Sequence, residues 1–236
     1  MKPSILVLAR AGGNPVATRF TKGGLSAQDP FADIREIAWS DEGGIAAGRV
    51  PLESRRDVRD FPHIEMLVVE TGSLTLTSGA TALVIGPGRG AVIAPGTDFT
   101  AEGTPGTRFS FCSAAVPAEL PAGIFELGPD APLAPSKPPP ADMLESEMPQ
   151  CRSSRKFDDT RAGFIAGTWD STAYQRKIRP HPVHELMHLI EGSVELTGSD
   201  GEVTRLDAGD CGFIARGADN RWDSRGKVAK FYAVQG

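Results

Sequence analysis

Three of the four histidines in this 236-residue chain lie in one short stretch, residues 181–188, together with Glu185. Arg179 precedes this stretch and Gly192 follows it, and the apolar residues between them have the pattern of a strand, a turn and a second strand. Imidazole and carboxylate groups bind transition metals and also transfer protons. The stretch therefore predicts either a metal centre or an acid–base site.

Successive side chains of a strand point to opposite faces, so His181 and Glu185 share one face while His184 and His188 share the other. Along a regular strand His181 and Glu185 would be separated by roughly 13 Å. A bend at Pro182 would bring the two together. We expect His184 and His188 at a sheet–sheet or subunit contact. A one-residue bulge at Pro182 would instead exchange the faces and make His184 a candidate ligand.

The order His181, three residues, Glu185, six residues, Gly192 resembles the first motif of the cupin superfamily. In that motif two histidines and the glutamate reach into a small β-barrel. His181 matches the second family histidine, and Arg179 stands at the position of the first. The resemblance implies a barrel fold and an inward-facing site at these residues.

Residues 207–222 resemble the second cupin motif, which is Gly, five residues, Pro-x-Gly, two residues and a ligand. Ala215 replaces the proline, and Asn220 stands where a His or Gln would ligate. The ending, with Trp222 and residues 230–232, is similar to the cupin branch that includes ureidoglycine aminohydrolase-like proteins and many members without an assigned activity.

An internal repeat indicates that the barrel unit occurs twice. Residues 65–77 match residues 185–197, so that Glu65 aligns with Glu185. With a gap of one residue, Gly88 also aligns with Gly209. Short alternating apolar runs have the spacing of antiparallel strands, and helical periodicity is nearly absent. Together with the family resemblance, these features predict an all-β chain of two tandem jelly-roll (cupin) barrels.

The composition of successive segments predicts the domain boundaries. Residues 5–8 could add a strand to a sheet edge, whereas the Pro-rich segment that includes Pro138-Pro139-Pro140 is expected to be a loop or semi-rigid spacer that cannot join a sheet. We divide the chain into four parts: an N-terminal arm (1–40), a first barrel (41–117), a Pro-rich linker (118–150) and a second barrel (151–236).

The second barrel is the candidate site. The resemblance implies that His181, Glu185 and the amide oxygen of Asn220 could hold one divalent transition metal, and such a donor set suits Mn, Fe, Ni or Zn without selecting among them. Arg179 weighs against a metal, because a guanidinium cannot ligate and instead fits a carboxylate or other planar anion. The alternative is that His181 and Glu185 hydrogen-bond to each other or to Arg179 in an eroded metal site.

Three functional hypotheses follow, and the first two concern a small acidic, amide or ureido metabolite. In the first, Arg179 and Asn220 bind the ligand, Trp222 and Tyr174 line it, and His181 with Glu185 catalyses hydrolysis or isomerisation, with or without a metal. In the second, the chain is a binding or regulatory module that does not turn the ligand over. In the third, the chain is a scaffold in which neither barrel binds a ligand and the sheets serve dimerisation. Trp222 would then serve equally well as a core residue.

The first barrel is expected to be structural and to hold no metal. The position that matches His181 is Phe61 and the position that matches Asn220 is Phe99, and two phenylalanines fill a small barrel as core. Glu65 remains, with His63 on the same face as a minor ligand-binding possibility.

Charge and composition exclude several classes of partner. The net charge is −5 without a dense basic run, which argues against nucleic acid, and no window has the roughly 18 apolar residues of a membrane span. The three scattered cysteines, Cys112, Cys151 and Cys211, indicate a reducing cytoplasm. We expect a homodimer, because closed two-fold assemblies are the commonest kind.

Overall fold

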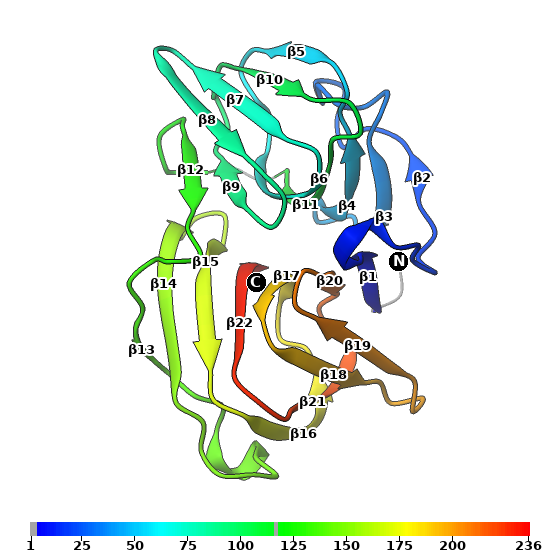
Figure 1. Ribbon diagram of the computed structural model, residues 1–236, viewed down its shortest axis with the longest axis vertical. Coiled ribbons are helices and arrows are strands. Elements are labelled where there is room, and N and C mark those ends of the chain that lie inside the picture. The colour runs from blue at the N-terminus through cyan, green and yellow to red at the C-terminus, as the bar shows by residue number, and fades with distance from the viewer. Residues whose placement is uncertain (1–3, 116–117) are drawn as a thin grey trace.

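The computed structural model describes residues 4–115 and 118–236. Figure 1 shows two β-rich lobes, with most of the first half of the chain in one lobe and the second half, together with the N-terminal strand Ile5–Ala9, in the other. Regular helix within the described residues is limited to two 3₁₀ turns, η1 (Ala11–Gly13) and η2 (Ala141–Met143). The prediction of an all-β chain with two tandem jelly-roll barrels is therefore confirmed.

The first barrel consists of a seven-stranded and a four-stranded sheet. Its strands are β2 (Thr21–Lys22), β3 (Glu36–Ser40), β4 (Ile45–Pro51), β5 (Arg55–Val58), β6 (Ile64–Thr71), β7 (Leu74–Ser78), β8 (Thr81–Ile85), β9 (Gly90–Ile93), β10 (Phe99–Gly103), β11 (Arg108–Ala114) and β12 (Ile124–Leu127). The larger sheet has the order β12-β9-β6-β11-β4-β3-β2, and the smaller has the order β5-β10-β7-β8.

The second barrel repeats this arrangement. Its strands are β1 (Ile5–Ala9), β13 (Ala134–Ser136), β14 (Cys151–Asp159), β15 (Phe164–Ser171), β16 (Tyr174–Pro180), β17 (His184–Glu191), β18 (Ser193–Thr197), β19 (Val203–Asp207), β20 (Cys211–Ile214), β21 (Asp219–Ser224) and β22 (Val228–Gln235). The larger sheet has the order β1-β20-β17-β22-β15-β14-β13, and the smaller has the order β16-β21-β18-β19.

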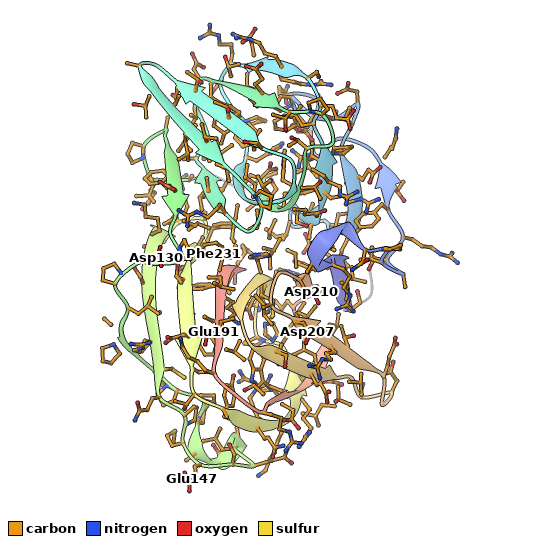
Figure 2. The ribbon with its side chains drawn as sticks, viewed as in Figure 1. Asp130, Glu147, Glu191, Asp207, Asp210 and Phe231 are labelled. Atoms are coloured by element: carbon orange, nitrogen blue, oxygen red, sulfur yellow. The ribbon has the colours of Figure 1, made fainter. Side chains whose placement is uncertain are left out.

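Strand alternation divides the apolar side chains among three cores. One core fills each barrel, and a third lies between the two seven-stranded sheets and joins the barrels. In β17, Met187 and Leu189 face the interior of the second barrel, whereas Leu186 faces the core between the barrels. Phe231 of β22 also belongs to the core between the barrels and lies near the junction of the two lobes (Figure 2).

The N-terminal arm contributes to both barrels. The strand expected at residues 5–8 is confirmed, because β1 pairs with β20 at the edge of the second barrel, and Leu8 is fully buried in the core between the barrels. The arm then crosses to the first barrel, where β2 and β3 extend its larger sheet.

The expectation that the Pro-rich segment cannot join a sheet was wrong for two short pieces. Strand β12 pairs with β9, and β13, which contains Pro135, pairs with β14. Both are edge strands, where a residue without a backbone N–H is tolerated because only one side must bond. Pro138-Pro139-Pro140 lies outside the strands, as expected.

No helix within residues 4–115 and 118–236 is both long and apolar enough to cross a membrane. The three cysteines of the chain are free and buried. Burial raises the pKa of the Cys112 thiol to about 12, which makes it unreactive at neutral pH.

Candidate functional site

The bend expected at Pro182 brings His181 and Glu185 together. Strand β16 ends at Pro180 and β17 begins at His184, and the turn between them is tied down by hydrogen bonds from His181 N to Ala218 O and from Gly217 N to His181 O. His181 Nε2 lies 3.0 Å from Glu185 Oε2. The two side chains therefore form a hydrogen-bonded pair at the inner surface of the second barrel.

Both ring nitrogens of His181 have partners. Asn220 Nδ2 lies 3.3 Å from His181 Nδ1. An amide N–H donates and cannot accept, so in this arrangement His181 Nδ1 accepts from Asn220 and His181 Nε2 donates to Glu185. The orientation of Asn220 is itself fixed by Arg176, whose guanidinium donates to Asn220 Oδ1 at 2.5 Å and to Asn220 O at 3.1 Å.

Lys230 is a third member of this site, and it was not predicted from the sequence. Its ammonium lies 2.7 Å from Glu185 Oε1, and its side chain is buried. The alternation of β22 could have identified it, because Phe231 and Ala233 face the core between the barrels, which places Lys230 inside the second barrel.

Lys230 and His181 keep the Glu185 carboxylate ionised. Burial alone raises the pKa of Glu185, but the Lys230 ammonium and the hydrogen bond from His181 outweigh it and lower the pKa to about 2. Glu185 is thus a carboxylate at neutral pH and forms an ion pair with Lys230.

Three aromatic side chains of the core of the second barrel pack beside this site. Tyr174 stacks on Trp222 with ring centroids 5.5 Å apart, and Trp169 packs edge-on against Trp222 at 6.2 Å. The Lys230 ammonium lies 4.8 Å from the ring centroid of Trp169 and 5.1 Å from that of Trp222. The structure therefore brings Tyr174 and Trp222 together beside the candidate ligands. Their role in binding stays a prediction.

Two guanidinium groups of β16 have no carboxylate partner within the described chain. Arg176 donates only to carbonyl and amide oxygens, and its pKa is lowered by burial and by the neighbouring charge of Arg179. The Nε atom of Arg179 is buried and has no hydrogen-bond partner. Arg179 pairs along the backbone with Asn220, next to the His181–Glu185 pair.

The predicted metal ligands do not fit a transition metal in this arrangement. The two oxygens of Glu185 are bonded to Lys230 and His181, both nitrogens of His181 are engaged, and the amide oxygen of Asn220 accepts from Arg176. The described residues contain no group of three or more His, Cys, Asp or Glu side chains that could hold a metal ion. The metal role of His181, Glu185 and Asn220 stays a prediction.

His184 and His188 lie on the opposite face, as expected. His184 packs against Trp39 of the first barrel at 4.8 Å, lies 3.3 Å from Asp41, and accepts a hydrogen bond from Arg216 N. His188 stacks on Phe231, in the core between the barrels. The exchange of faces considered for Pro182 does not occur.

The first barrel is filled, as its two phenylalanines predict. Phe61 and Phe99 pack with ring centroids 5.5 Å apart. Glu65 Oε2 accepts from Arg35 at 2.8 Å, and Arg35 also forms a bidentate pair with Asp29 at 2.7 and 3.0 Å. Sequence reasoning missed Arg35, because it comes from the arm and no motif marks it.

The buried Glu65 gives a testable pH dependence. Burial raises the pKa of Glu65 from 4.5 to about 7, which the Arg35 charge only partly offsets. Between these values the folded chain keeps a proton that the unfolded chain releases, so this group lowers the free energy of unfolding as pH rises from about 4.5 to about 7. Relative to wild type, Glu65→Gln is expected to gain on the order of 3 kcal/mol across this window.

Urea titrations at a series of pH values measure this difference. Glu102→Gln, at an exposed position of β10, is the matched control and should follow the wild-type curve. Parallel curves for Glu65→Gln and wild type would show that Glu65 does not keep its proton between about pH 4.5 and about pH 7.

Comparisons with known proteins identify the family. A model of the EutQ-like cupin domain matches residues 160–232. The chain is 44% identical to a protein of unknown function of the DUF861 family from Pseudomonas syringae pv. tomato, with a TM-score of 0.96, over 99% of this chain and 100% of that chain. No curated protein matches the sequence.

More distant solved structures share the fold. A cupin 2 conserved barrel domain protein from Leptotrichia buccalis has a TM-score of 0.60 at 8% identity, over 86% of this chain and 88% of its own. A putative glyoxylate induced protein from Pseudomonas aeruginosa has a TM-score of 0.57 at 17% identity, over 98% of this chain and 96% of its own. With the full-length match to the Pseudomonas syringae protein, these findings show that the chain belongs to the DUF861 family of the cupin superfamily.

Proposed function

We propose that the second barrel binds a small organic anion, a carboxylate that carries an amide or ureido group. One observation carries this proposal: the surroundings of Glu185 hold more positive than negative charge. The buried Arg176 and Lys230 and the half-buried Arg179 lie near a single carboxylate, Glu185, which Lys230 already neutralises. A buried charge without a counter-ion is costly, and an anionic ligand would supply that counter-ion.

Each part of such a ligand has a matching group. A carboxylate suits the planar donor pattern of Arg179, whose Nε lacks a partner, and of Arg176 beside it. An amide or ureido N–H would donate to the Glu185 carboxylate. The Trp222 and Tyr174 rings would cover the apolar part of the ligand.

A catalytic role is the second candidate, because His181 and Glu185 form a hydrogen-bonded pair of the kind used in proton transfer. For hydrolysis or isomerisation, His181 Nδ1 would have to leave Asn220 and face the substrate. Exchange of His181 for alanine separates the candidates: loss of turnover with retained affinity indicates catalysis, and loss of affinity alone indicates a binding protein.

Isothermal titration with small carboxylates tests the binding proposal. The ligands are acetate, oxamate and ureidoacetate, with urea as the uncharged comparison. We expect the ureido carboxylate to bind best and Arg179→Gln to weaken it about 10- to 100-fold, because a hydrogen bond to a charged group contributes about 1.5–3 kcal/mol.

Arg155→Gln, on the exposed part of β14, is the matched control and should bind as wild type does. Wild-type protein that binds none of the three carboxylates, or Arg179→Gln that binds them equally well, would refute the proposal. The homodimer and the cytoplasmic location stay predictions, and light scattering tests the first of them.

A further inference from the structure

The repeat places two glutamates at equivalent positions, and each is bonded to a cation of the chain itself. Glu65 of β6 pairs with Ile93 of β9, and Glu185 of β17 pairs with Ile214 of β20. Arg35 Nη1 lies 2.8 Å from Glu65 Oε2, and Lys230 Nζ lies 2.7 Å from Glu185 Oε1. The glutamate of the cupin motif therefore has an internal counter-ion in both barrels.

The two cations come from positions that the repeat does not relate. Leu189 of β17 pairs with Lys230, and the equivalent Val69 of β6 pairs with Phe109, so Phe109 occupies the Lys230 position in the first barrel. Arg35 precedes β3 and enters the first barrel from the arm. A contact between the motif glutamate and a buried cationic side chain has thus been built twice from different parts of the chain.

The surroundings of the two cations are also alike. The Arg35 guanidinium lies 4.2 Å from the ring centroid of Phe111 and 5.5 Å from that of Phe31. Lys230 lies between two tryptophans in the corresponding way, at 4.8 and 5.1 Å from the ring centroids. A carboxylate flanked by two aromatic rings can bind a cation. In each barrel a side chain of the protein itself, Arg35 or Lys230, occupies the position of that cation.

We infer that Lys230 determines which kind of ligand the second barrel can bind. Its ammonium occupies the cation position beside Glu185 and thereby excludes a divalent metal ion. An ion bound to Glu185 and His181 would lie beside the Lys230 ammonium and compete with it for Glu185 Oε1. Arg179 adds a second positive charge at the position where the family motif has a histidine. The inference does not depend on which organic anion the barrel binds.

The test is titration with Co²⁺, followed by calorimetry and by the visible absorption of the bound ion. Wild-type protein should bind no stoichiometric Co²⁺. Lys230→Met combined with Arg179→His removes the internal cation and restores the family ligand, and this variant should bind stoichiometric Co²⁺ and gain thermal stability from it. Binding should be lost again when His181→Ala is added.

Lys227→Met combined with Arg179→His is the matched control, because Lys227 forms an exposed pair with Glu191 near the start of β22, and this variant should stay free of Co²⁺. Stoichiometric Co²⁺ in wild-type protein that is lost in His181→Ala would overturn the inference, as would a folded Lys230→Met/Arg179→His variant that binds none. Lys230→Gln, which keeps a hydrogen-bond donor for Glu185, replaces Lys230→Met if circular dichroism shows that Lys230→Met does not fold.

Discussion

Replacing Arg35 with alanine is expected to lower the free energy of unfolding by about 3–5 kcal/mol. Arg35 is fully buried and bonds to both Asp29 and Glu65, whose side chains are also fully buried. Alanine would leave two carboxyl groups in the first barrel without a counter-ion, and it would remove a guanidinium that packs on Phe111. The loss of charge pairing and the cavity act in the same direction.

Urea denaturation followed by tryptophan fluorescence measures this effect. Arg59→Ala removes an arginine from the exposed pair with Asp98 and should leave the unfolding curve nearly unchanged, since solvent screens such pairs. Adding Glu65→Gln to Arg35→Ala should recover part of the loss, because it removes one of the stranded carboxyl groups. An Arg35→Ala curve that coincides with the Arg59→Ala curve would show that the buried ion pairs do not stabilise the fold.

Residues 151–236 expressed alone are expected not to unfold cooperatively, although the sequence divides the chain at this point. The fragment lacks β1, so the edge of β20 has no partner. It also exposes the face of the larger sheet that carries Leu186, Phe213 and Phe231, which are fully buried against the first barrel in the intact chain. An exposed apolar sheet face with an open edge favours aggregation over folding.

Thermal melting and the dispersion of amide proton resonances test this expectation. Co-expression of residues 1–150 should restore a cooperative transition, because the two pieces together contain every strand of the core between the barrels. An isolated fragment that melts cooperatively near the temperature of the full chain would show that the second barrel is an independent domain.

The sequence contained enough to predict the architecture, because duplication and strand alternation are local patterns. The match between Glu65 and Glu185 identified two barrels. The alternation of side chains along the strand also placed Glu185 correctly on the face opposite to His184 and His188. The bend at Pro182 was also predictable, since two ligand-type side chains on one face could meet only if the chain turned there.

The cations were not predictable in the same way. Lys230 lies 45 residues from Glu185 in sequence, and Arg35 lies 30 residues before Glu65, so no spacing rule connects either pair. Each is also a departure from the rule that lysine and arginine stay exposed. Only the three-dimensional arrangement shows that Glu185 already has a cation, which adds a second argument against a metal to the one that Arg179 gives in the sequence.

The topology also sets the order in which the chain can complete its fold during synthesis. Strand β1 is made first, but more than 200 residues separate Ile5 from its partner Ile214. At roughly 5–20 residues per second the arm therefore waits on the order of 10–40 seconds for its partner. The last strand, β22, then inserts between β17 and β15 in the middle of the larger sheet. A chain that is released before residue 228 therefore lacks a central strand, and its larger sheet stays open between β17 and β15.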